Sequence, residues 1–196
     1  MLPPDPPARM PPLTPQTCTE EARAMFERWK SGSFRNSAQN PVLWTFAHHP
    51  QLADLFSALN IHLLSTTTLP LRERQIAIMR TAWLCKARYM WSSHLRTSLG
   101  RGLEPELFKP LQVGAADPYF TAFERLVIHA TEDLVRDRLI SAANWQALAA
   151  HWDNKQMLDF MFTVGTYVLV AGVMRSTGVQ REPELLELAE RYGAPE

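Results

Sequence analysis

The sequence predicts an all-α protein, and three features of its patterning favour that class. Apolar side chains recur at helical spacing through most of the chain, prolines and capping residues separate these runs, and no segment alternates like a strand. The β-branched residues between Val164 and Val173 belong to an apolar run that is too long for a usual strand. We expect about nine or ten helices in a single domain over residues 17–196, preceded by a proline-rich arm over residues 1–16.

The composition excludes several classes of partner. Twenty Lys and Arg balance twenty Asp and Glu, so no long-range field attracts nucleic acid or anionic lipid. Two cysteines outside any CxxC or Cys/His cluster favour a reducing compartment, and the N-terminus has no apolar run like that of a signal peptide. The run from Phe160 to Met174 is shorter than the roughly 20 residues that cross a bilayer, and it predicts a buried core helix. We therefore expect a cytoplasmic protein without nucleic acid or membrane partners.

The N-terminal arm and the first helix are marked by prolines and a cap. The prolines of the arm exclude a helix or a sheet ladder there, so it should be extended. Thr17 and Glu20 form a capping-box pair ahead of an amphipathic helix that reaches about Lys30. Gly32 and Ser33 should end that helix.

Two further helices should precede the central part of the chain. Asn40 is the expected cap of a short helix that begins at Pro41, and another helix should begin at Pro50. The expected apolar stripe of that helix consists of Leu52, Leu55, Phe56, Leu59 and Leu63.

The last part of the chain predicts a short helix around residues 105–109 and then four longer ones. Each longer helix has a recognisable beginning, formed by a capping residue or a proline. The first should begin at Asp117–Pro118 and reach about Arg136, and the second should begin at Ser141. The third should begin at Asn154 and end near Gly178, and the fourth should begin at Pro183 and reach about Tyr192.

The stretch from Leu69 to Leu103 combines two helical patterns with the residues best suited to chemistry. The first pattern begins with polar residues at 72–75, and the second carries Tyr89, Trp91 and His94. An imidazole among aromatic side chains can transfer a proton in a site that excludes water. We expect this helix pair to hold the active site.

This order of residues resembles the carboxymuconolactone decarboxylase-like family, which includes the alkyl hydroperoxide reductase D (AhpD)-type proteins. The resemblance covers nearly the whole chain. It implies an all-α hydroperoxidase D-like fold, a homo-oligomer that is a trimer or hexamer, with a dimer as an alternative, and an active site between the two motif helices. It rests on Arg72-Glu73-Arg74, Arg80-x-Ala82-Trp83, Tyr89-x-Trp91-x-x-His94 and Gly100-x-Gly102-Leu103.

The resemblance also indicates which parts of the family's machinery this chain keeps. In redox members a Glu, a CxxC pair and a His form a proton relay. Here His94 keeps the histidine, whereas Gln75 stands at the Glu position and Ala87 and Met90 stand at the two Cys positions. Dithiol chemistry is unavailable, because a resolving thiol must lie close to the attacking one. The chain resembles the non-redox branch that lacks CxxC.

We expect His94 and Gln75 to be the catalytic residues. Gln75 cannot ionise, so it can orient His94 or a substrate oxygen but cannot act as a base. Without a nearby carboxylate, His94 should be neutral near pH 7 and should act first as a base. The candidate substrate-binding residues are Arg80, Trp83, Tyr89, Met90, Trp91 and Tyr167, each with a structural role as the alternative, and Arg72, Arg74 and Arg96 are further candidates for an anionic substrate.

The expected function is that of a decarboxylase-like lyase or isomerase without a cofactor. It would act on a small carboxylated, lactone or enolisable cyclic compound of aromatic or secondary metabolism through proton transfer at His94. Two alternatives stay open: a thiol-dependent peroxidase-like enzyme that uses Cys85, and a relative without catalysis that binds a ligand or assists assembly. The histidine spacing forms no metal set and no glycine-rich phosphate loop is present, so we expect neither metal nor cofactor.

Overall fold

The computed structural model describes residues 5–29 and 40–196, and within these ranges it contains ten α-helices and no strand. The all-α class is therefore confirmed. The chain divides into two compact units. The larger unit contains Thr68–Val173 and Arg181–Glu196, and the smaller contains Asp5–Thr67 and Met174–Gln180, apart from the undescribed residues. The expected helix end at Gly32 and Ser33 lies outside the described residues, and the single domain over 17–196 stays a prediction.

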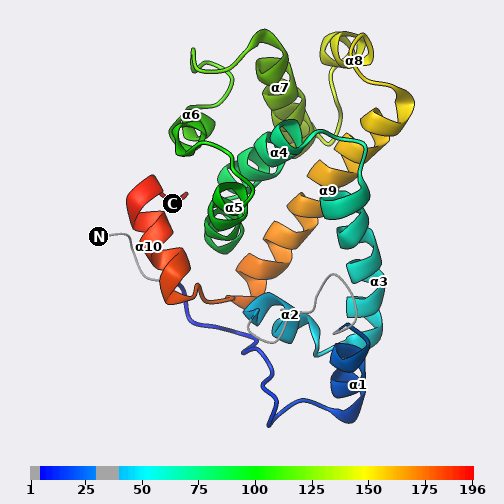
Figure 1. The fold of residues 1–196 in the computed structure, drawn as a ribbon, viewed down its shortest axis with the longest axis vertical. Coiled ribbons are helices and arrows are strands. Elements are labelled where there is room, and N and C mark those ends of the chain that lie inside the picture. Colours follow the sequence, from blue (N-terminus) through cyan, green and yellow to red (C-terminus); the bar gives the residue numbers. More distant parts are fainter. Residues whose placement is uncertain (1–4, 30–39) are drawn as a thin grey trace. The chain divides into compact units, whose positions relative to one another are not determined.

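The smaller unit is built on three helices. They are α1 (Glu20–Trp29), α2 (Pro41–Phe46) and α3 (Pro50–Ile61), and a short π-helix (His62–Thr66) follows α3. α3 packs against both α1 and α2 (Figure 1). Aromatic side chains dominate the core between them, where the rings of Phe26 and Trp44 lie 4.1 Å apart between centroids. Asn40 caps α2 as expected, accepting hydrogen bonds from the backbone of the first helical turn.

The proline-rich arm is attached to the smaller unit by backbone hydrogen bonds. The N–H groups of Arg9 and Met10 both donate to the carbonyl of Thr177, at 2.8 and 3.0 Å. Gly178 comes next to Thr177 and has a φ of +71°, and a Cβ built there would lie 2.7 Å from the carbonyl oxygen of Pro7. Only glycine accommodates both the positive φ and this close approach. The arm therefore follows the end of α9 (Asn154–Thr177).

Three details of the expected helices are wrong. α1 is capped by Thr19, whose hydroxyl accepts from Ala22 N at 3.1 Å, because the Thr17 side chain is used in a turn with Thr14. α7 (Ala122–Asp137) begins at a capping box of Thr121 and Glu124 rather than at Asp117–Pro118. The predicted stripe of α3 is exposed at Leu52 (58%) and Leu55 (74%), because this helix buries its small side chains, Ala53 and Ser57, instead.

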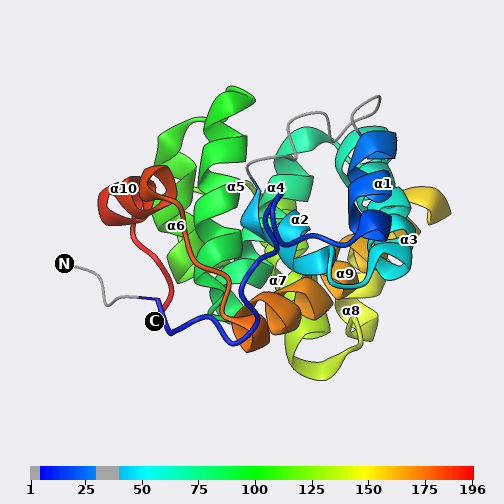
Figure 2. The ribbon, with the colours of Figure 1, turned by 90° about the horizontal axis from the view of Figure 1, so that it is seen from below.

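α4 (Leu71–Leu84) is the central helix of the larger unit. Every residue from Arg74 to Ala82 is buried, because α4 contacts α5 (Arg88–Gly100), α6 (Phe108–Val113) and α7. Figure 2 shows α10 (Pro183–Tyr192) alongside α5, and α8 (Ala142–Ala149) packs on α7. The expected beginnings at Ser141, Asn154 and Pro183 are confirmed. A helix that is surrounded in this way holds its side chains in fixed positions.

A tight turn joins α4 to α5. Lys86 adopts a left-handed conformation with φ of +54°, its N–H donates to Trp83 O, and Ala87 N–H donates to Ala82 O at 2.9 Å. This pair of hydrogen bonds is the Schellman motif, in which the residue with positive φ is usually glycine. Cys85 is the last residue before the turn and is half-buried, so it is less buried than its position in the motif suggested.

The length and composition of α9 would suffice to cross a membrane, and no other helix in the described ranges passes the same test. About half of it belongs to the core, since 44% of its most apolar window is buried. Phe160, Val164 and Tyr167 face inwards, whereas Phe162 and Leu169 are more than half exposed. The expected core helix is thus present, with one apolar face uncovered.

Candidate functional site

His94 and Gln75 meet in the interior of the larger unit. His94 comes from the second turn of α5 and is 8% exposed, and Gln75 comes from α4 and is fully buried. A hydrogen bond of 2.9 Å joins His94 Nδ1 to Gln75 Oε1. The close packing of α4 on α5 thus brings together two residues that are 19 positions apart in the sequence.

The amide of Gln75 selects one form of the imidazole. Its oxygen can only accept, so the hydrogen bond places the proton of the neutral ring on Nδ1 and leaves the lone pair on Nε2. Ser98, one turn after His94, donates its hydroxyl to the same oxygen at 3.3 Å. The other end of the amide, Gln75 Nε2, is buried and has no hydrogen-bond partner among the described residues. The site therefore contains a basic ring nitrogen and an unused donor.

Tyr167 of α9 covers the imidazole. Its ring meets that of His94 edge to face, with 5.2 Å between the centroids, and the residue is 5% exposed. Burial raises the pKa of the Tyr167 phenol above its ordinary value, and the positive charges of Arg74 and Arg101 oppose this effect. The phenol is therefore neutral under ordinary conditions and can only donate or accept a hydrogen bond.

The electrostatic environment keeps His94 neutral. Burial, followed by the positive charges of Arg74 and Arg101, lowers the pKa of His94 to about 3. Burial and the charge of Arg101 also lower the pKa of Arg74 below its ordinary value, while Tyr167 opposes this. No carboxylate acts on His94, which separates this site from a relay that contains an acid.

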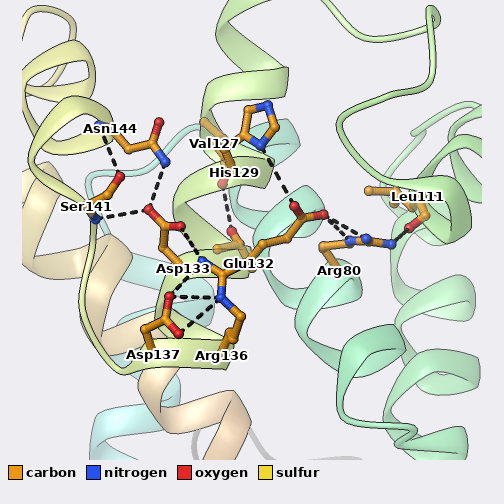
Figure 3. A network of polar contacts seen from close by, with 11 residues as sticks. Arg80, Leu111, Val127, His129, Glu132, Asp133, Arg136, Asp137, Ser141 and Asn144 are labelled. Carbon is orange, nitrogen blue, oxygen red and sulfur yellow. Dashed lines mark hydrogen bonds and ion pairs between the residues drawn. The ribbon is translucent and has the colours of Figure 1, made fainter.

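Three of the four motif arginines that were candidates for an anionic substrate are held in ion pairs. Arg72 bridges Glu104 and Glu124, and Arg96 pairs with Glu184 at 3.2 Å on the surface. Arg80 pairs with Glu132 of α7 at 2.7 Å and donates to the carbonyl of Leu111 (Figure 3). It also donates to the carbonyl of Gln112. These contacts use most of the donors of Arg80, so the structural alternative describes it better than a substrate anchor. The fourth arginine, Arg74, differs from the others.

Three other substrate-binding candidates lie in a second cluster, next to the C-terminal segment. The rings of Trp83 and Trp91 lie 5.0 Å apart, and Trp91 Nε1 donates to Gly193 O at 2.8 Å. Tyr89 donates its hydroxyl to Glu182 at 3.2 Å. Met90 is 1% exposed and lies one helical turn before His94 on α5, and Tyr167 is the candidate whose ring contacts the imidazole.

Sequence reasoning missed Ser98 and Arg101. Both follow His94 at helical spacing, four and seven residues later, which places them near its face of α5. That spacing was the available signal. Among the described residues no group of three His, Cys, Asp or Glu side chains could hold a metal ion.

Comparisons with solved structures identify the fold. An uncharacterized peroxidase-related protein from Silicibacter sp. TM1040 has a TM-score of 0.75 at 17% identity, over 100% of this chain and 98% of the other. The alkylhydroperoxidase AhpD core of a peroxidase-related protein from Ralstonia eutropha JMP134 has a TM-score of 0.74 at 16% identity, over 97% and 99%. The chain has the AhpD-like fold.

The AhpD-like fold is also that of an enzyme among the similar structures, the debrominase Bmp8. Its ligand-free structure has a TM-score of 0.76 at 11% identity, over 94% of this chain and 97% of the other. No protein-family model matches the sequence, and no curated protein matches it either. At such low identities the likeness establishes the AhpD-like fold alone, and the chemistry must be argued from the site.

Proposed function

We propose that this AhpD-like protein is a lyase or isomerase without a cofactor, in which His94 transfers a proton on a small carboxylated, lactone or enolisable cyclic compound. The observation that carries the proposal is the hydrogen bond of 2.9 Å from His94 Nδ1 to the Gln75 amide, which fixes the tautomer of a buried neutral imidazole. Such a ring offers Nε2 as a base. Gln75 orients it without competing for the proton.

The chemistry requires the imidazole alone. In an isomerisation, Nε2 takes a proton from a carbon beside a carbonyl group, the electron pair passes to the carbonyl oxygen, and the imidazolium returns the proton to another carbon. In a decarboxylation, the bond between the carboxylate and the carbon beside the carbonyl group breaks, carbon dioxide leaves, and the electron pair passes to the carbonyl oxygen as an enolate. His94 Nε2, after taking a proton from solvent, then donates that proton to the carbon. Both routes need a substrate whose carbonyl group accepts electrons.

A small cyclic substrate is supported by the debrominase comparison. A variant of that enzyme has been crystallised in complex with 2,3,4-tribromopyrrole, a small ring compound. In this chain, the edge-to-face contact of Tyr167 with His94 provides an aromatic surface beside the proposed base. An aromatic edge beside the base suits a planar ring.

The peroxidase-like alternative has less support. Cys85 is a free cysteine at the end of α4, and Ala87 and Met90 occupy the positions of a CxxC pair. A single thiol would need another reductant to complete each turnover. Loss of peroxide consumption in Cys85→Ser, with peroxide consumption retained in His94→Gln, would favour this alternative.

The proposal is tested by proton exchange rather than by a guessed product. The purified protein is incubated in D₂O with a panel of lactone carboxylic acids and cyclic keto acids, and deuterium incorporation and carbon dioxide release are followed. We expect His94→Gln to lower the rate by roughly a hundredfold or more, as loss of a general base does. His129→Gln, whose side chain is 55% exposed on α7, serves as the matched control. Unchanged exchange in His94→Gln would remove the proposed mechanism.

A further inference from the structure

Arg74 is a buried cation without a partner. It is 5% exposed, its Nε is buried without a hydrogen bond, and its side chain makes no hydrogen bond or ion pair with any residue in the described ranges. Arg72, Arg80 and Arg96 of the same helix pair all have carboxylate partners. Burying most of an arginine side chain, its Nε included, without an anion is unfavourable, so its position here requires a reason.

A second unsatisfied donor lies next to Arg74 in the chain. Gln75 is fully buried, its oxygen is used by His94 and Ser98, and its Nε2 has no partner. Buried polar groups are normally hydrogen-bonded, and each exception calls for an explanation such as an unseen ligand. The unpaired donors of Arg74 and Gln75 lie on consecutive residues, Gln75 contacts His94, and the charge of Arg74 acts on the same ring, which points to one ligand with acceptor oxygens.

We propose that Arg74, assisted by the Gln75 amide nitrogen, binds the carboxylate of a small organic acid beside His94. Arg74 carries five N–H donors in a planar fork that matches the two oxygens of a carboxylate. This inference rests on the proposed function, since it names the substrate group that the same site recognises. It replaces Arg80 by Arg74 as the anchor.

Binding of the anion changes the base as well as the substrate. In the free protein the charges of Arg74 and Arg101 disfavour an imidazolium at His94, and Tyr167, the other titratable group against the ring, is neutral. A carboxylate on Arg74 offsets one of these charges, so the pKa of His94 rises and Nε2 becomes a stronger base. By linkage, protonation of His94 must in turn tighten the binding of the anion. A substrate with a carboxylate therefore activates its own base.

The test compares a carboxylate ligand with an uncharged amide of similar shape. Binding of benzoate and of benzamide to the full chain is measured by calorimetry, with inorganic phosphate as a second anion. We expect benzoate to bind about tenfold or more tightly than benzamide, and Arg74→Gln to remove most of that difference. Arg74→Lys should restore part of it, and Arg96→Gln, an exposed paired arginine, should leave it unchanged. Equal affinity for benzoate and benzamide, or unchanged benzoate binding in Arg74→Gln, would overturn the proposal.

A second variant separates binding from a structural role. Arg74→Met keeps an unbranched apolar stem and removes the buried charge, so we expect it to abolish benzoate binding and to raise the unfolding temperature. A lower unfolding temperature or a change in assembly mass would overturn the proposal, because it would show that Arg74 has a structural partner, such as a carboxylate of a second copy.

The failure of this inference is distinguishable from failure of the proposed function. His94→Ala should still bind benzoate while losing proton exchange. If the wild type binds benzoate through Arg74 but exchanges no proton on any acid of the panel, the anion site stands and the lyase or isomerase is excluded. If exchange depends on His94 but not on Arg74, the proposed function stands and the anion site falls.

Discussion

The amide of Gln75 determines how His94 can behave. An amide fixes the ring by hydrogen bonding but gives no electrostatic support to an imidazolium, so burial and two nearby arginines hold the pKa of His94 at about 3. A carboxylate at this position would favour the protonated ring. With Gln75 as its partner, His94 is therefore held as the neutral imidazole.

Gln75→Glu should reverse that state. The new carboxylate would accept the Nδ1 proton of His94 and favour its charged form, so we expect the pKa of His94 to rise by at least one unit, roughly the effect of a close opposite charge. NMR titration of the ring protons measures this. A raised pKa together with lost exchange would show that the neutral ring is the active form, whereas an unchanged pKa would contradict the assigned hydrogen bond.

The low pKa of His94 also predicts a loss of stability in mild acid. Between its unfolded value of about 6.5 and its folded value, the unfolded chain binds a proton that the native protein does not, so stability falls as pH falls. Each proton contributes a slope of about 1.4 kcal/mol per pH unit. Urea unfolding at about pH 7 and about pH 5 should show a smaller loss for His94→Gln than for the wild type. Equal losses would contradict the buried neutral ring.

At the scale of single elements, the caps and prolines of the sequence located most helices, and the errors have local causes. Pro41, Ser141 and Pro183 begin helices as predicted, since these positions follow backbone rules that no tertiary contact overrides here. The predicted buried face of α3 was wrong, because a helix with apolar residues on several faces can bury its small side chains and expose the large ones. Which face a helix buries depends on its neighbours, and these are not written in its own sequence.

Gly178 gives a prediction about the arm. Alanine there would carry a strained positive φ and place its Cβ against the Pro7 carbonyl, so Gly178→Ala should cost roughly 1–3 kcal/mol or release the arm. Hydrogen exchange at the amides of Arg9 and Met10 reports that release. Gly100→Ala, at the end of α5 with nothing within 4 Å of its Cβ, is the matched control and should be neutral or slightly stabilising. Equal effects of the two changes would contradict the docking of the arm.

At the scale of the whole molecule, the exposed face of α9 bears on assembly. Five exposed residues of α9 follow one another at alternating intervals of four and three residues: Leu158, Phe162, Gly165, Leu169 and Gly172. This is the spacing of a helix seam that meets another helix, and the glycines allow close approach. The net charge of zero adds no repulsion between copies. We propose that this face binds a second copy of the chain, which keeps the homo-oligomer as a hypothesis.

Light scattering on Phe162→Glu tests that interface. A charge in the seam should lower the assembly mass, because a buried unpaired carboxylate is unfavourable. Leu139→Glu is the control, since Leu139 is 69% exposed but lies outside α9. If both variants keep the mass of the wild type, or if both lose it, this face is not the interface.

The site as a whole was predictable only in part. His94 and Gln75 could be paired because both match positions of the family that the sequence resembles, whereas Arg80 was preferred to Arg74 as the substrate anchor. What distinguishes them is Glu132, a carboxylate from α7 that pairs with one and not the other. Long-range charge pairing of this kind requires the folded chain.

The turn at Lys86 fixes the number of residues that can separate Gln75 from His94. Three residues connect the two helices, and the N–H group of each donates a hydrogen bond to a carbonyl of the last turns of α4. An insertion or deletion of one residue there would rotate α5 by about 100° against α4 and carry His94 away from its partner. Proteins that use the same pair of residues should therefore have no insertion or deletion in this segment. A Gln and a His separated by 19 residues, on two consecutive helices, can then be used to recognise the pair in distantly related sequences.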